Sequence, residues 1–222
     1  MISDKYKYIF LHTPKCGGSS IEQVLLQIEE ALPSEKFSSL HWVDHLECRI
    51  KNKFVLGKNL KFISHKGLEK ESFSCQHFAM QDYILNFPSQ QKDFFKFTFV
   101  RNPWDKAVSE WKYFLKVDPD YNFTFQESLH AHYYVWHLYP WEEHNWEQFK
   151  YAEGCDFVGR FENLQQDFNT VCDKIGISRQ QLPHTNKSQR KHYTEYYDDE
   201  TREIVAEKFA KDIEHFGYKF GE

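Results

Sequence analysis

Residues 6–20, which read Tyr-Lys-Tyr-Ile-Phe-Leu-His-Thr-Pro-Lys-Cys-Gly-Gly-Ser-Ser, decide the fold. Residues 6–12 are mostly β-favouring, so we predict a short strand there. The apolar side chains after the two glycines recur at helical spacing, at Ile21, Val24, Leu25 and Ile28. The stretch therefore predicts a strand, a glycine-rich loop and a helix in direct succession.

The same alternation of strands and helices continues along the chain. Further strands are predicted at residues 61–65, 94–100 and 157–161. Helices are predicted from Pro103 through Leu115, from Leu164 to a stop at Gly176, and from Ile204 to a stop at Gly217. This order implies an α/β fold of one domain over residues 1–222, a P-loop-like, mainly parallel sheet flanked by helices on both faces.

The composition is that of an ordinary globular protein, with 41% hydrophobic and 27% charged residues. A net charge of −5 argues against a non-specific nucleic-acid binder, which needs a basic surface. No apolar run is long enough to cross a bilayer, and the charged first residues do not resemble a secretory signal. We therefore expect a cytoplasmic protein without stable membrane insertion. The cysteines are scattered as reduced thiols would be, at Cys16, Cys48, Cys75, Cys155 and Cys172.

The glycine-rich loop offers a binding site for phosphate or sulfate. Such a loop presents unpaired backbone N–H groups at the positive end of a helix dipole. Lys15 adds a full charge, and Ser19 and Ser20 add hydroxyl donors. The nucleotide-binding pattern GxxxxGK[ST] is absent, because here the lysine precedes both glycines. Cys16 reads as a small filler of the loop, and a purely structural turn is the alternative for the whole segment.

A second candidate anion site follows the strand at residues 94–100. Arg101 ends this strand, and its planar guanidinium suits a phosphate group. Ser109 lies about two turns into the next helix and can reach a ligand along that face. The alternative is a structural salt bridge at Arg101 and a surface position for Ser109.

These residues carry a resemblance to a known family. Residues 12–20 resemble the 5′-phosphosulfate loop of sulfotransferases that use 3′-phosphoadenosine 5′-phosphosulfate (PAPS), especially the carbohydrate-modifying branch. Residues 99–109 resemble the same family's 3′-phosphate motif, and residues 157–164 and 186–218 are similar to the end of bacterial members. The resemblance covers most of the chain and is weakest between residues 34 and 70 and between residues 117 and 150.

The resemblance implies PAPS as donor, adenosine 3′,5′-bisphosphate as product, and no metal. Lys15 is implied to be catalytic, in contact with the phosphosulfate. Lys187, Ser188 and Arg190 lie in a polar segment that either closes over the donor, as the tail of the family does, or forms a solvated surface. The implied donor-binding residues are Pro14, Lys15, Cys16, Gly17, Gly18, Ser19, Ser20, Arg101, Ser109, Lys187 and Ser188.

His77 is the predicted catalytic base. It lies where related carbohydrate sulfotransferases place a catalytic histidine, and an ordinary imidazole pKa of about 6.5 suits proton abstraction near neutral pH. His65 is the reserve candidate, and Glu69 and Glu71 are more distant ones. A metal cluster around His41 and His45 is disfavoured, because its spacing is generic.

The expected acceptor is a hydroxyl of a carbohydrate or glycolipid. Aromatic residues make up 18% of the chain, and they either line an acceptor groove or belong to the core. Candidates for the groove are Phe123, Tyr133, Trp136, Tyr139, Trp141 and Trp146. Two alternative functions stay open, an atypical nucleotide-dependent kinase and a non-catalytic nucleotide- or glycan-binding protein of the same fold.

Overall fold

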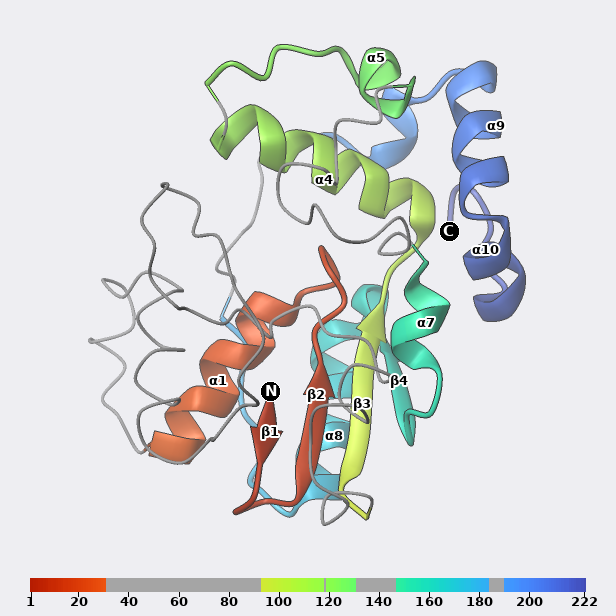
Figure 1. The fold of residues 1–222 in the computed structure, drawn as a ribbon. Coiled ribbons are helices and arrows are strands. Elements are labelled where there is room, and N and C mark those ends of the chain that lie inside the picture. The colour runs from red at the N-terminus through yellow and green to blue at the C-terminus, as the bar shows by residue number, and fades with distance from the viewer. Residues whose placement is uncertain (31–92, 118, 131–146, 184–189) are drawn as a thin grey trace, which may run out of the picture.

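Four strands form one sheet in the computed structural model, which describes residues 1–30, 93–117, 119–130, 147–183 and 190–222 (Figure 1). The strands lie in the order β1 (Ile2–Ser3), β2 (Tyr8–Leu11), β3 (Phe95–Val100) and β4 (Phe157–Arg160). β1 is antiparallel to β2, whereas β2 with β3 and β3 with β4 are parallel pairs. The prediction of a mainly parallel sheet is confirmed. The strand expected at residues 61–65 lies outside the described residues.

The helices follow the predicted order, with differences at their ends. They are α1 (Gly18–Glu30), α4 (Pro103–Val117), α5 (Phe125–His130), α7 (Gln148–Ala152), α8 (Leu164–Ile175), α9 (Asp199–Lys208) and α10 (Ala210–Phe216), with 3-10 turns η3 (Phe161–Asn163) and η4 (Tyr193–Tyr196). The strand expected to reach residue 161 ends one residue earlier, because Phe161 begins η3.

The last helix was expected to be continuous, and this prediction is wrong. Phe209 separates α9 from α10, with backbone angles φ −113° and ψ 25°. Its side chain is buried in a cluster with Val100, Trp104 and Val108. Helical hydrogen bonds still flank the break, from the Phe209 N–H to the Val205 carbonyl and from the Ile213 N–H to the Phe209 carbonyl, each over 3.0 Å. Gly217, in the left-handed region at φ 68°, ends α10 where the sequence predicted a stop.

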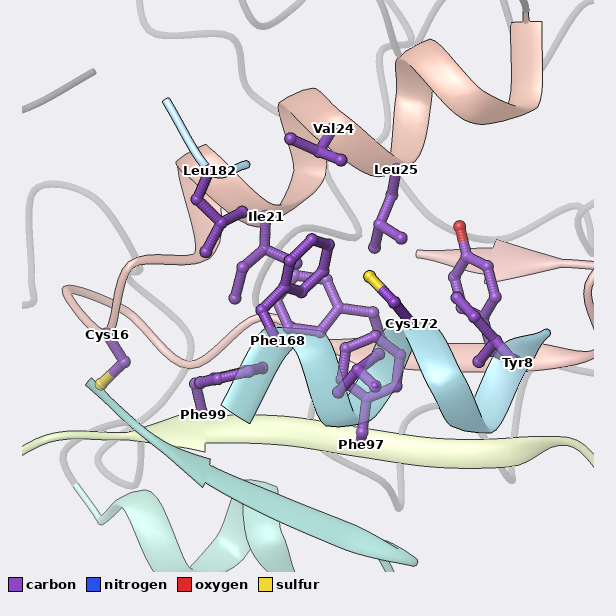
Figure 2. Close-up of a cluster of buried hydrophobic side chains, with 13 residues drawn as sticks. Tyr8, Cys16, Ile21, Val24, Leu25, Phe97, Phe99, Phe168, Cys172 and Leu182 are labelled. Carbon is purple, nitrogen blue, oxygen red and sulfur yellow. The ribbon is translucent and has the colours of Figure 1, made fainter. Parts of the chain in front are cut away.

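One face of the sheet carries the main aromatic core (Figure 2). Alternating residues of β2 and β3 point toward α1 and α8, and the rings of Phe10 and Phe97 stack with centroids 5.0 Å apart. α1 contributes an apolar stripe to this core, and α8 contributes a second one that includes the fully buried Phe168. Burial of such side chains is worth roughly 1.5–3 kcal/mol each and holds both helices on the sheet.

The opposite face is covered by a smaller apolar cluster. Ile9, Leu11 and Phe94 form it, with Cys155 packed against them. Cys155 follows α7, and α7 itself contacts β3. Helical segments therefore lie on both faces of the sheet, as predicted.

The carboxyl ends of β2, β3 and β4 meet at one edge of the sheet, below α4 (Figure 1). The C-terminal helices hold α4 in place there. The indole Nε1 of Trp104 donates to the carbonyl oxygen of Arg202 over 3.1 Å, and the Tyr197 hydroxyl donates to the carbonyl oxygen of Trp104 over 2.7 Å. Ligands of open α/β sheets bind at this edge, so the loops that leave it are where a functional site is expected.

Candidate anion-binding site at the carboxyl edge of the sheet

The loop between β2 and α1 is anchored to the neighbouring strand by Thr13. The Thr98 hydroxyl donates to the carbonyl oxygen of Leu11 over 2.8 Å, and the hydroxyls of Thr13 and Thr98 are also 2.8 Å apart. Because a hydroxyl has one proton, Thr13 is the donor to Thr98. This chain of hydrogen bonds fixes the start of the loop.

The backbone of this loop is shaped as an anion cradle. Lys15 and Gly17 both lie in the left-handed region, at φ 64° and 83°. Glycine adopts this conformation freely, whereas for a lysine it is strained by about 1–3 kcal/mol. Strained backbone of this kind is typical of functional sites. The N–H groups of residues 15–19 have no hydrogen-bond partner within the described part of the chain. They lie beside the positive N-terminus of α1, where they can bind a phosphate or sulfate.

Gly18 is needed for the packing of the loop. A Cβ atom on Gly18 would come within 2.3 Å of the His12 ring. This ring is buried below the loop, and its Nδ1 lies 3.1 Å from Oε1 of Glu22 in α1. The absence of a side chain at Gly18 therefore lets the helix begin directly over His12.

The Lys15 ammonium group lies against an aromatic ring. Its Nζ is 3.9 Å from the ring centroid of Tyr113 in α4. The pKa of Lys15 is lowered to about 8, mainly by burial. Glu110 acts in the opposite direction, and the nearby positive charges of Arg101 and Lys106 add to the lowering. The group is still mostly protonated at neutral pH and can stabilise negative charge on an anion in the loop.

Arg101 joins the two motifs that the sequence singled out. Its Nη1 donates to the carbonyl oxygen of Lys15 over 3.0 Å. Its Nε and Nη2 both contact Oδ2 of Asp105, at 2.8 and 2.6 Å, and its guanidinium carbon lies 3.8 Å from the ring centroid of Phe161. The salt bridge considered as an alternative for Arg101 is thus present, and the side chain also reaches the anion loop.

Asp105 binds a second arginine from the C-terminal part of the chain. Nη2 of Arg190 donates to the other carboxylate oxygen, Oδ1. Nη1 of Arg190 is buried and has no partner among the described residues. This region borders a cavity of about 510 Å³, lined by Asp105, Phe161, Glu162, Arg190, Lys191, His192, Tyr193 and Glu222.

Gln148 forms hydrogen bonds to residues of both motifs, and the sequence did not predict this role. Its Oε1 accepts from the Arg101 N–H over 2.8 Å, and its Nε2 donates to the Arg101 carbonyl over 2.9 Å. The Cys16 thiol lies 3.1 Å from the same Oε1. Asp212 accepts the N–H groups of Gln148 and Phe149, each over 2.9 Å, and burial raises its pKa. A single glutamine in an aromatic segment carries no motif that could have revealed this role.

The other predicted residues of the two motifs lie at or near this edge. Ser19 and Ser20 are half-buried at the start of α1, and Ser109 is half-buried in α4. The Cys16 thiol is buried, which raises its pKa to about 12, so it fills the loop and is no nucleophile. Phe123 stands in an aromatic cluster, its ring centroid 5.2 Å from that of Tyr121.

Several predicted residues lie outside the described part of the chain. They are His77, His65, Glu69, Glu71, Lys187, Ser188, His41, His45, Tyr133, Trp136, Tyr139, Trp141 and Trp146. Among the residues that are described, no group of three or more His, Cys, Asp or Glu side chains could hold a metal ion. The same residues include no helix long and apolar enough to cross a membrane.

Comparisons with known proteins identify the family. An uncharacterized protein from Archaeoglobus fulgidus is 32% identical over 81 residues, which span 36% of this chain and 67% of that protein. The crystal structure of a sulfotransferase from Alicyclobacillus acidocaldarius aligns with 94% of this chain and 92% of its own, at 16% identity and a TM-score of 0.41. The sequence model of the sulfotransferase family matches residues 1–219. Because this match spans nearly the whole chain, the protein belongs to the sulfotransferase family, whose enzymes transfer a sulfuryl group.

Proposed function

We propose that the protein transfers the sulfuryl group of PAPS to a hydroxyl of a carbohydrate or glycolipid. The observation that carries this proposal is the hydrogen bond of Arg101 to the carbonyl oxygen of Lys15, 3.0 Å long. It places an arginine beside a loop whose N–H groups are available for an anion. PAPS carries two anionic groups on one nucleoside, the 5′-phosphosulfate and the 3′-phosphate, so its enzyme needs two adjacent anion sites.

The residues of the loop suit the 5′-phosphosulfate. In this proposal Lys15, Ser19 and Ser20 bind it together with the N–H groups of residues 15–19, while Pro14, Cys16, Gly17 and Gly18 shape the loop. Lys15 stabilises the negative charge that grows on the leaving phosphate oxygen. Most of the rate enhancement then comes from positioning and electrostatics, as in phosphoryl transfer.

The residues after β3 suit the 3′-phosphate. Arg101 supplies a guanidinium, and Ser109, about two turns further along α4, supplies a hydroxyl. Lys187 and Ser188, from the C-terminal part of the sequence, are proposed to close over the donor.

We assign His77 as the base. The acceptor oxygen forms a bond to sulfur while the bond between sulfur and the 5′-phosphate oxygen breaks. The proton of the acceptor hydroxyl passes to the His77 imidazole, and the electron pair of the broken bond leaves with adenosine 3′,5′-bisphosphate.

A cytoplasmic location is part of the proposal. Cys16, Cys155 and Cys172, the cysteines within the described ranges, are free thiols. Free thiols are typical of the reducing cytoplasm, where PAPS would be the soluble donor.

Calorimetric titration tests the donor assignment. The purified protein is titrated with adenosine 3′,5′-bisphosphate, with AMP, and with ATP plus Mg²⁺. We expect selective binding of the bisphosphate, which alone carries the 3′-phosphate. A preference for ATP with Mg²⁺ would support a kinase instead, and absence of binding to any of the three would contradict the donor pocket.

Ser109→Ala is the mildest variant of the proposed 3′-phosphate site. We expect it to weaken binding of the bisphosphate by roughly tenfold to 150-fold, the value of one hydrogen bond to a charged group, and to leave AMP binding unchanged. Ser178→Ala, at an exposed serine after α8, is the matched control. Equal losses for both nucleotides would remove Ser109 from the 3′-phosphate site.

The acceptor class is tested with labelled donor. The protein is incubated with [³⁵S]PAPS and with monosaccharides, oligosaccharides and glycolipids in parallel. Label in a sugar-containing product supports the proposal, whereas transfer only to phenols or to peptide tyrosine overturns the carbohydrate assignment.

A further inference from the structure

Asp105 holds two arginine side chains that come from distant parts of the chain. Its Oδ2 accepts Nε and Nη2 of Arg101, at 2.8 and 2.6 Å, and its Oδ1 accepts Nη2 of Arg190. All three side chains are largely buried, with exposed fractions of 13% for Asp105, 5% for Arg101 and 15% for Arg190. The two guanidinium groups therefore lie on opposite sides of one carboxylate.

We propose that Asp105 is a positioning residue for selectivity toward the 3′-phosphate of the donor. It holds Arg101 and Arg190 on its two carboxylate oxygens, so that Arg190 presents its remaining N–H donors to the phosphate. This inference rests on the proposed function and adds to it a carboxylate that acts through the two arginines.

The net charge of this cluster favours the binding of an anion. Two guanidinium groups and one carboxylate sum to one positive charge, and Nη1 of Arg190 is buried without a partner in the described residues. A buried donor without a partner is unfavourable, and a bound phosphate oxygen would satisfy it. Arginine and phosphate form strong, charge-assisted hydrogen bonds with defined geometry.

The surroundings of the cluster support a phosphate at this point. The cavity of about 510 Å³ borders both Asp105 and Arg190. Two further carboxylates line this cavity. Glu162 accepts the N–H of Asn102 over 2.7 Å and the hydroxyl of Tyr218 over 3.2 Å, and Glu222 pairs with the Lys219 ammonium group at 3.7 Å. Lys191, also at the cavity, is positive and pairs with Glu195 at 3.5 Å.

Asp105 cannot bind the phosphate directly, because two anions repel each other. Two opposite results are therefore possible when its charge is removed. If Asp105 only weakened the site by repulsion, Asp105→Asn would bind the bisphosphate more tightly. If Asp105 positions the arginines, the variant binds it less tightly, because the asparagine N–H groups face the N–H groups of an arginine.

The experiment compares Asp105→Asn with Arg190→Gln by calorimetric titration with adenosine 3′,5′-bisphosphate and with AMP. Arg190→Gln keeps the contact between Arg101 and Asp105, so it tests the site even if Asp105→Asn unfolds. The matched control is Asp173→Asn, which breaks an arginine pair of the same kind on the surface, with Arg179 at 3.1 and 2.8 Å.

We expect each site variant to bind the bisphosphate at least tenfold more weakly and AMP within twofold of the wild type. The control variant should bind both nucleotides as the wild type does. The double variant Asp105→Asn/Arg190→Gln should lose little more than either single variant, since both changes remove the same contact to the phosphate.

Two results would overturn the inference. Tighter bisphosphate binding by Asp105→Asn means repulsion without positioning, and an Arg190→Gln variant that keeps the selectivity of the wild type means that Arg190 does not touch the phosphate. In both cases a selective wild type leaves the proposed function intact. A wild-type protein that does not distinguish the bisphosphate from AMP overturns the proposed function together with this inference.

Discussion

Arg101 and Lys15 are joined by a hydrogen bond of 3.0 Å from the guanidinium Nη1 of the first to the carbonyl oxygen of the second. The bond connects the end of β3 with the loop after β2, which are neighbours only because the two strands pair in parallel. Gln148 adds a second connection through the Arg101 backbone and the Cys16 thiol. The two candidate anion-binding elements are thus joined by hydrogen bonds, and changes in one are expected to affect the other.

Lys15→Met should abolish transfer and stabilise the fold. Loss of one preorganised cation at the reacting phosphate is expected to lower the rate by about 10²-fold or more. At pH 7 the lysine is charged although it is largely buried, so its removal should raise the free energy of unfolding by about 1–3 kcal/mol. Transfer assays and thermal melts check both, with the exposed Lys116→Met as control. Retained turnover would contradict the role of Lys15.

The value of kcat/KM for transfer should fall as the pH rises through about 8, where Lys15 of the free protein loses its proton. The sign follows from the chemistry, because only the protonated ammonium stabilises the charge on the leaving phosphate. Lys15→Arg should move this alkaline limb above pH 10, since arginine stays protonated there. A pH–rate profile checks the prediction, and an unchanged limb in the arginine variant would assign it to another group.

His77→Ala should separate donor binding from transfer. Loss of a general base is expected to lower the rate by about 10²- to 10⁴-fold, while the affinity for adenosine 3′,5′-bisphosphate stays the same. Calorimetry and a transfer assay measure the two quantities. His130→Ala, at a histidine whose side chain is 56% exposed, is the control. If His77→Ala still transfers at the normal rate, the base lies elsewhere.

Gly18→Ala should destabilise the protein, because the added Cβ meets the His12 ring at 2.3 Å. Overpacking of this kind costs about 1–3 kcal/mol. Chemical denaturation measures the loss. His12→Ala removes the ring. In a protein that already carries this change, adding Gly18→Ala should therefore cost much less stability than it does in the wild type. An unchanged cost would mean that another contact limits the residue at position 18.

Gln148→Leu should lower stability by about 1–3 kcal/mol for each backbone group of Arg101 that it leaves unpaired. Gln126→Leu is the control, because that side chain is exposed and donates its hydrogen bond to the exposed Glu200, over 3.1 Å. Its effect should be within about 0.5 kcal/mol of the wild type. If chemical denaturation shows the same loss of unfolding free energy for both variants, the buried hydrogen bonds of Gln148 do not stabilise the protein more than an exposed one does.

The regular elements were predictable because their signals are local. The strand and helix periods, the strand end at Arg101 and the stops at Gly176 and Gly217 all depend on neighbouring residues. β1 has only two residues and therefore no period, and its pairing depends on β2. The break at Phe209 depends on where its ring is buried, which no local pattern describes.

The sequence by itself determined the order of strands and helices, the glycine-rich loop after β2 and the family. Each of these depends on short segments of the sequence, on their spacing and on their turn residues. Only the tertiary structure decided that Arg101 reaches Lys15, that Asp105 shares its carboxylate between Arg101 and Arg190, and that Gln148 lies below both motifs. The physical reason is that, apart from the local pair of Arg101 and Asp105, these contacts join residues far apart in the chain. Such residues meet only when the sheet and its helices have packed.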